Sequence, residues 1–112
     1  MARVKSTASR KHRGFLKRAR GFGQSRRIRI QAAKEALLHA GQYAYAGRKL
    51  KKRDLRSLWI TRLGAAAKLN GLSYNQLISG LKKANVELNR KVLSDIAAAD
   101  PQTFSKIISE IK

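Results

Sequence analysis

The sequence predicts an all-α protein in which a long basic N-terminal extension and helix are followed by a small C-terminal helical domain. No segment shows the alternating polar and apolar residues of a β-strand. Residues 30–72 contain no proline and are rich in Ala, Leu, Lys, Arg and Gln, which favour helix. Residues 1–60 carry 18 basic and 2 acidic side chains, whereas the remaining residues carry 8 and 4. We therefore expect a basic region over residues 1–58 and a globular domain over residues 59–112.

The first 34 residues hold 12 basic side chains and no acidic one, with few bulky apolar side chains. Such a segment cannot bury enough apolar surface to offset an ordering entropy of ~1–2 kcal/mol per residue. We expect it to be mostly disordered when isolated, with a short helix around Leu16 once its charges are neutralised. Residues 21–23, Gly-Phe-Gly, indicate a break in the helix.

Residues 30–72 are expected to form one long helix, which at 1.5 Å per residue would span about 60 Å. Gly41, Gly47 and Gly64 each cost about 1 kcal/mol relative to alanine and weigh against continuity. Between Arg48 and Arg56, basic side chains occupy more than half of the helix circumference. Because such a helix gains little from packing on protein, something else must cover it.

Three short helices are expected after this long one. Ser73 and Gln76 have the spacing of a capping box, and Asn89 is a plausible N-cap for the next helix. Asp100 followed by Pro101 is typical of a third helix start. The inward faces are expected to consist of Leu77, Ile78 and Leu81 in the first helix, Val92, Leu93 and Ile96 in the second, and Phe104, Ile107, Ile108 and Ile111 in the third.

These helices are expected to pack on the end of the long helix and form a small core. The long-helix residues expected in that core are Leu58, Trp59, Leu63, Ala66 and Leu69. A domain of about 55 residues is marginal in size but can fold.

The composition excludes most catalytic chemistry. The chain has no cysteine and only two histidines, His12 and His39, which lie far apart in the sequence. There are no paired carboxylates, no Ser/His/Asp arrangement and no phosphate-loop glycine pattern. We expect no enzymatic activity, metal or cofactor. No stretch approaches the roughly 18 apolar residues that span a bilayer, and the N-terminus lacks the apolar core of a secretory signal.

The charge favours a polyanionic partner. The net charge is +20 and the isoelectric point is about 11.6, with 8 Arg and 4 Lys among the first 34 residues. Guanidinium groups suit phosphate contacts and base stacking, so an arm that folds on RNA is the favoured interpretation. A transit peptide is also rich in Arg and Ser and poor in acids. A membrane-surface helix would need one wide apolar stripe, which residues 1–60 lack.

The aromatic side chains among the basic residues can be interpreted in two ways: they contact RNA, or they belong to the hydrophobic core. Tyr43 and Tyr45 have little core available and favour RNA contact, whereas Trp59 is flanked by apolar residues at helical spacings and favours the core. Residues 67–79 imitate a helix-turn-helix, in which residues 74–76 would reach base edges. A plain helical hairpin, with Gly71 ending one helix and Ser73 capping the next, is favoured.

Residues 41–63, GQYAYAGRKLKKRDLRSLWITRL, carry a family resemblance. Their most specific part is Lys52-x3-Arg56-x-Leu58-Trp59-Ile60-x-Arg62-Leu63. The opening Ala2-Arg3-Val4-Lys5 and the segments over residues 70–74 and 80–84 match as well. The chain resembles the bacterial-type ribosomal large-subunit protein family twenty over nearly its whole length. It departs from that pattern at Ala46-Gly47, where an Arg-Asp pair is common, and at Gly64, where Asn is usual.

The resemblance implies a structural protein that binds 23S rRNA directly and promotes early large-subunit assembly. It implies neighbouring large-subunit proteins and the protein's own mRNA as further partners, and a place in the ribosome of the cytoplasm or of an organelle. The rRNA-binding residues that the resemblance implies are Arg3, Lys5, Arg10, Lys11, His12, Arg13, Lys17, Arg18, Arg20, Arg26, Arg27, Arg29, Tyr43, Tyr45, Arg48, Lys49, Lys51, Lys52, Arg53, Arg56 and Arg62. The alternative function is a DNA-binding architectural or helix-turn-helix protein.

Overall fold

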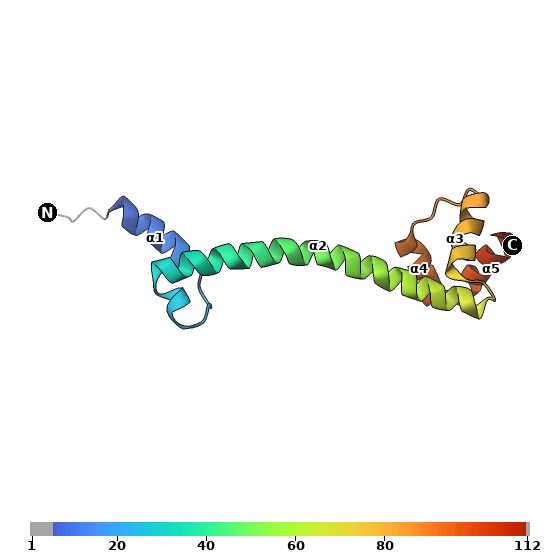
Figure 1. Ribbon diagram of the computed structural model, residues 1–112, viewed down its shortest axis with the longest axis horizontal. Coiled ribbons are helices and arrows are strands. Elements are labelled where there is room, and N and C mark those ends of the chain that lie inside the picture. The colour runs from blue at the N-terminus through green and yellow to red at the C-terminus, as the bar shows by residue number, and fades with distance from the viewer. Residues whose placement is uncertain (1–5, 112) are drawn as a thin grey trace. The chain divides into compact units, whose positions relative to one another are not determined.

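The computed structural model describes residues 6–111, and the all-α class is confirmed, since these residues form helices and no strand (Figure 1). The helices are α1 (Thr7–Arg18), the 3₁₀ helix η1 (Gln24–Arg27), α2 (Ile30–Leu69), α3 (Tyr74–Lys83), α4 (Arg90–Ala99) and α5 (Pro101–Ile111). Backbone contacts divide the chain into two compact units, Met1–Lys49 and Leu50–Lys112.

Helix α1 begins and ends at local signals. The Ser6 hydroxyl accepts a hydrogen bond from the Ser9 amide at 3.2 Å, which caps the first turn. After Arg18 the chain turns away through Gly21, whose φ of +88° lies in the left-handed region that glycine adopts without strain. The break expected at residues 21–23 is therefore confirmed, and the helix around Leu16 extends over 12 residues.

The first unit buries very little. Among residues 6–49, only Ala19, directly after α1, and Ala33, in the first turns of α2, are fully buried. Two alanine side chains contribute little hydrophobic stabilisation, because burial is worth only about 0.8 kcal/mol per CH₂.

Helix α2 is continuous for 40 residues and passes through Gly41, Gly47 and Gly64 without a break. It ends at Leu69, three residues before the limit expected from the sequence. The end is a Schellman motif: the amides of Gly71 and Leu72 donate to the carbonyls of Lys68 and Ala67 at 3.0 and 2.9 Å. Gly71 has a φ of +78°, so the expected helix-ending role of this glycine is confirmed.

The predicted caps of the second unit are confirmed. Ser73 and Gln76 form a reciprocal capping box at the start of α3, with bonds of 3.3 and 2.8 Å. The Asn89 side chain accepts from the Val92 amide at 2.9 Å and starts α4. Each cap satisfies helix amides that would otherwise lack a partner.

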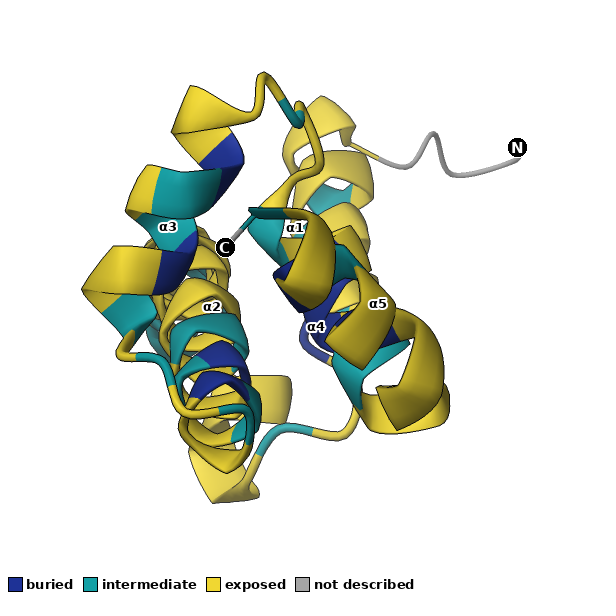
Figure 2. Cartoon of the chain, turned by 90° about the vertical axis from the view of Figure 1, so that its right-hand side faces the viewer, coloured by how far each residue is buried: buried dark blue, intermediate teal, exposed yellow. Residues whose placement is uncertain are grey.

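The core of the second unit lies where α3, α4 and α5 meet the end of α2 (Figure 2, dark blue). Helix α5 packs against both α3 and α4. At Gly80 a β-carbon would lie 3.3 Å from Ile111, so the missing side chain lets α3 approach α5 closely. The buried cluster consists of Leu63, Ala67, Leu77, Leu81, Leu93, Phe104 and Ile108.

Four residues expected in the core lie outside it. Leu58 and Leu69 are 42% and 90% exposed, because at 100° per residue they lie on other sides of α2 from Leu63. Val92 is 40% exposed, since Leu93 takes the inward position of α4. Trp59 is half-buried one turn before Leu63 and is not among the side chains packed around the core.

We expect a fragment of residues 59–112 to fold alone, whereas a fragment of residues 1–40 will not. The reason is the contrast between a seven-residue buried cluster and two buried alanines. Circular dichroism with thermal melting checks this result. A cooperative helical transition in the isolated 1–40 fragment would overturn it.

Asp100 should make stability depend on pH. Its carboxylate caps α5 by accepting the Thr103 amide at 3.1 Å and the Thr103 hydroxyl. The hydroxyl, then the amide, hold the pKa of Asp100 below its ordinary value of 3.8. The stabilisation is therefore present above the unfolded pKa and is lost as the pH falls through the folded pKa.

We expect Asp100→Ala to lower the thermal midpoint most at neutral pH, and this deficit to shrink in strong acid, where the protonated carboxyl of the unsubstituted chain keeps only a neutral cap. Asp100→Asn keeps an N-cap acceptor and is the matched control. Melting curves across this pH range check the result. An Asp100→Ala deficit that persisted unchanged into strong acid would show that the carboxylate charge is not its source.

Candidate nucleic-acid interface

Helix α1 separates its basic side chains from its apolar ones. Phe15 and Leu16 are half-buried on one side, and the Lys34 ammonium of α2 lies 5.4 Å from the centroid of the Phe15 ring. This apolar side was missed by the sequence reasoning, because the density of charge masked it. The exposed residues of the predicted set on this helix are Arg10, Lys11, His12, Arg13, Lys17 and Arg18.

The loop between α1 and α2 presents four more arginines. The 3₁₀ helix is short, and its end is held by the Ile28 and Arg29 amides, which donate to the Ser25 carbonyl at 3.1 and 2.8 Å. Because these bonds use only backbone atoms, the guanidinium groups remain available to a ligand. The exposed arginines here are Arg20, Arg26, Arg27 and Arg29.

The middle of α2 has no protein cover. Every residue from 38 to 58 is exposed, a run of almost six helical turns. Among the described residues of this run, Asp54 is the only acidic one. The cations here are Arg48, Lys49, Lys51, Lys52, Arg53 and Arg56, and Arg62 is exposed one to two turns further on.

Tyr43 and Tyr45 lie in this run and are 73% and 57% exposed. The Lys49 ammonium lies 4.6 Å from the centroid of the Tyr45 ring, and the His39 and Tyr43 rings stack with centroids 6.3 Å apart. The Lys49 contact holds an aromatic face beside a cation, which is the combination that stacks on bases near phosphates.

The second unit contains one basic side chain, held in place by a hydrogen bond, that sequence reasoning missed. The Arg90 Nε atom donates to the Tyr74 hydroxyl at 2.9 Å, which joins the start of α4 to the start of α3. The two residues are 16 positions apart, so no local pattern reveals the contact. The turn before α3 is likewise tied to α5, because the Ser105 hydroxyl donates to Asn70 Oδ1 at 2.9 Å.

Arg3 and Lys5 of the predicted set lie outside the described residues, 6–111. Over that same range, no group of three or more His, Cys, Asp or Glu side chains could hold a metal ion. A search of the described helices for one long and apolar enough to cross a membrane found none.

Comparisons with known proteins agree over the whole chain. A family model described as ribosomal protein L20 matches residues 2–107. The large ribosomal subunit protein bL20 of Geobacter metallireducens is 53% identical over 114 residues, covering 100% of this chain and 97% of that protein. The proteins of the same name from Pelobacter propionicus and Marinobacter nauticus are 54% and 48% identical, covering 96% and 100% of this chain and 93% and 97% of theirs.

A small all-α fold with an uncovered cationic helix, together with these matches, defines the class: a structural, non-enzymatic ribosomal protein of the large subunit. The matches cover nearly the whole chain, and they therefore also show the family. The chain belongs to the ribosomal protein L20 family.

Proposed function

We propose that this protein binds 23S rRNA directly through α1, η1 and α2, and that it promotes early assembly of the large subunit. The observation that carries the proposal is the exposed run over residues 38–58 of α2. A helix with cations over more than half of its circumference, and no cover from the rest of the described chain, has its charges neutralised best by phosphates on several sides. The whole predicted set, Arg3 and Lys5 included, is proposed to contact this RNA.

The proposal for early assembly rests on the weak core of the first unit. With only Ala19 and Ala33 fully buried among residues 6–49, this unit depends on a partner for its order. Such a segment enters open RNA more easily than RNA whose helices have already packed. It therefore binds early and folds as it binds.

The second unit is proposed to determine where on the rRNA the protein binds. Phosphate contacts position a protein but carry no sequence information, so a folded surface must recognise one RNA shape. Neighbouring large-subunit proteins are the further partners in the particle. The protein's own mRNA is a second RNA ligand if it reproduces that shape.

Duplex DNA is a poorer ligand for the turn between α2 and α3. Of the residues that a helix-turn-helix would direct at bases, Tyr74 is half-buried and bonded to Arg90, and the Gln76 side chain is used in the capping box. Both would have to leave these contacts to read a major groove.

Competition binding tests the proposed function. The full chain is mixed at one salt concentration with 23S rRNA fragments, other folded RNA of equal length, and duplex DNA. We expect one rRNA fragment to displace the others. If duplex DNA competes as well as every rRNA fragment does, the proposal is wrong.

A further inference from the structure

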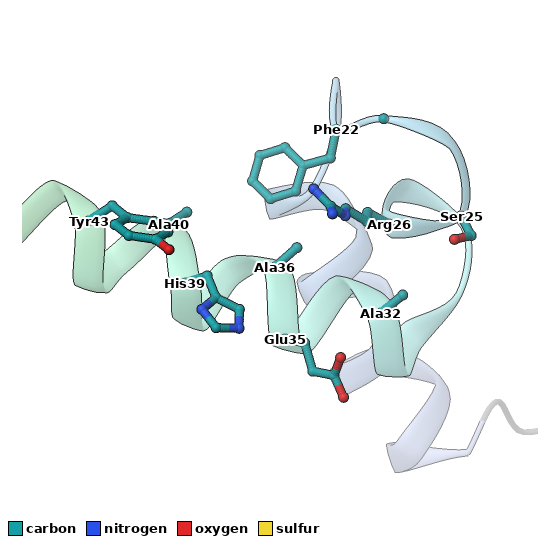
Figure 3. A pocket seen from close by; sticks show the side chains of 10 residues that line it. Phe22, Ser25, Arg26, Ala32, Glu35, Ala36, His39, Ala40 and Tyr43 are labelled. Atoms are coloured by element: carbon teal, nitrogen blue, oxygen red, sulfur yellow. The ribbon is translucent and has the colours of Figure 1, made fainter.

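The first unit contains a hollow whose apolar lining the phosphate-binding role does not use. Residues 21–27 fold back over the first turns of α2 and border an open hollow of about 680 Å³ (Figure 3). One wall is formed by Phe22 and Arg26, and the opposite wall by α2. Phe22 is half-buried there, and it lies between two glycines.

Three alanines form one stretch of the α2 wall. Ala32, Ala36 and Ala40 follow at intervals of four residues, so their methyl groups lie along one side of the helix. Figure 3 shows these methyl groups pointing toward Phe22 and Arg26. Glu35, His39 and Tyr43 of α2 line the hollow as well. The alanine methyl groups on one wall and the Phe22 ring on the other suit a flat aromatic ligand.

The charges around the hollow determine the orientation of the bound ligand. Arg26 offers a guanidinium group beside Phe22, whereas the Glu35 carboxylate points away from both (Figure 3). Glu35 is the only acidic residue in the sequence from 1 to 49. The same stretch contains 14 lysines and arginines. An anionic group is attracted to the Arg26 side and repelled from the Glu35 side.

We infer that this hollow is a nucleotide slot, which takes one unpaired RNA base between Phe22 and the alanine face of α2, with its phosphate at Arg26. The inference rests on the proposed RNA-binding function and adds a recognition of single-stranded nucleotides to it. Stacking on an aromatic ring tolerates every base, so the slot selects unpaired over paired nucleotides rather than a sequence.

The test compares two ligands that carry the same phosphates. The full chain binds oligoadenylate of about 12 nucleotides, a length within the usual site sizes, or an abasic ribose-phosphate chain of equal length. The ratio of the two affinities measures the contribution of the bases. We expect Phe22→Ala to reduce this ratio roughly 5- to 100-fold, the range for loss of one stacked base, while Phe22→Trp preserves it.

A second variant fills the slot without removing a wall. Ala40 is exposed, and leucine is nearly as good a helix former as alanine, so Ala40→Leu blocks the space while the chain stays folded. Ala65→Leu is the matched control, because Ala65 is exposed on α2, lies outside the run over residues 38–58 and does not line the hollow. We expect Ala40→Leu to reduce the ratio and Ala65→Leu to leave it unchanged.

A third pair of variants distinguishes binding in the slot from general attraction by positive charge. Arg26→Gln should lower the affinity ratio, whereas Arg27→Gln, which removes the same charge from η1 outside the hollow, should weaken both ligands equally. An unchanged ratio in both Phe22→Ala and Ala40→Leu would overturn the slot. That outcome would leave the proposed function standing as long as the unsubstituted chain still prefers a 23S rRNA fragment to duplex DNA. If that preference is absent, the proposed function fails by itself, and the two-ligand comparison still decides the slot.

Discussion

Raising the salt concentration from about 50 to about 200 mM is expected to weaken binding of this chain to a 23S rRNA fragment by a factor of roughly 300 or more. Each neutralised phosphate contributes about −0.7 to −0.9 to the slope of log affinity against log salt. We expect the exposed cations of α1, η1 and α2 to supply roughly 6 to 10 such contacts if they bind RNA as proposed.

Filter binding at a series of salt concentrations measures this slope. Arg53→Gln should make the slope shallower by about one phosphate contact, because Arg53 is exposed in the uncovered run of α2. Lys106→Gln, at an exposed position of α5, is a matched control outside that run. A slope equivalent to about two contacts or fewer would show that α2 does not lie among phosphates.

The second large effect concerns the division of labour between the two regions. Removing residues 1–40 should leave specific but much weaker rRNA binding and stall large-subunit assembly. Removing residues 60–112 should leave binding that is tight at low salt but does not discriminate between RNAs. The physical reason is that the first region holds most of the charge, whereas the second holds the buried core that keeps one shape.

Competition binding on 23S fragments and sedimentation of particles from depleted cells measure both effects. The control for the first deletion is a chain whose residues 1–40 have a scrambled order and the same charge. If residues 1–59 alone choose the correct fragment as well as the full chain does, the second region is not the source of specificity.

Local signals made most of the fold predictable. The caps at Ser73, Asn89 and Asp100 each depend on a residue only three positions away, so the sequence contains all the information they need. Gly71 could be identified for the same reason, since its positive φ is part of a turn closed within five residues. Such features follow from hydrogen-bond geometry and not from the rest of the fold.

The sides of the long helix were less predictable. Leu58 and Leu69 have the composition of core residues, but only the position of the neighbouring helices decides which side of α2 is covered. The same limit applies to the candidate interface. Charge predicted that Arg48 to Arg56 would be uncovered, whereas the hollow beneath Phe22 depends on a turn that brings residues 22 and 36 together.

The uncovered run of α2 also has a consequence for the supply of this protein in the cell. Residues 38–58 gain no protection from packing, so in an unbound copy their helical hydrogen bonds open at a low free-energy cost. Proteases that cut after Arg or Lys then find six sites within nine residues, from Arg48 to Arg56. A copy covered by a partner is shielded, so surplus copies should be degraded first, and the amount of intact protein follows the amount of available partner.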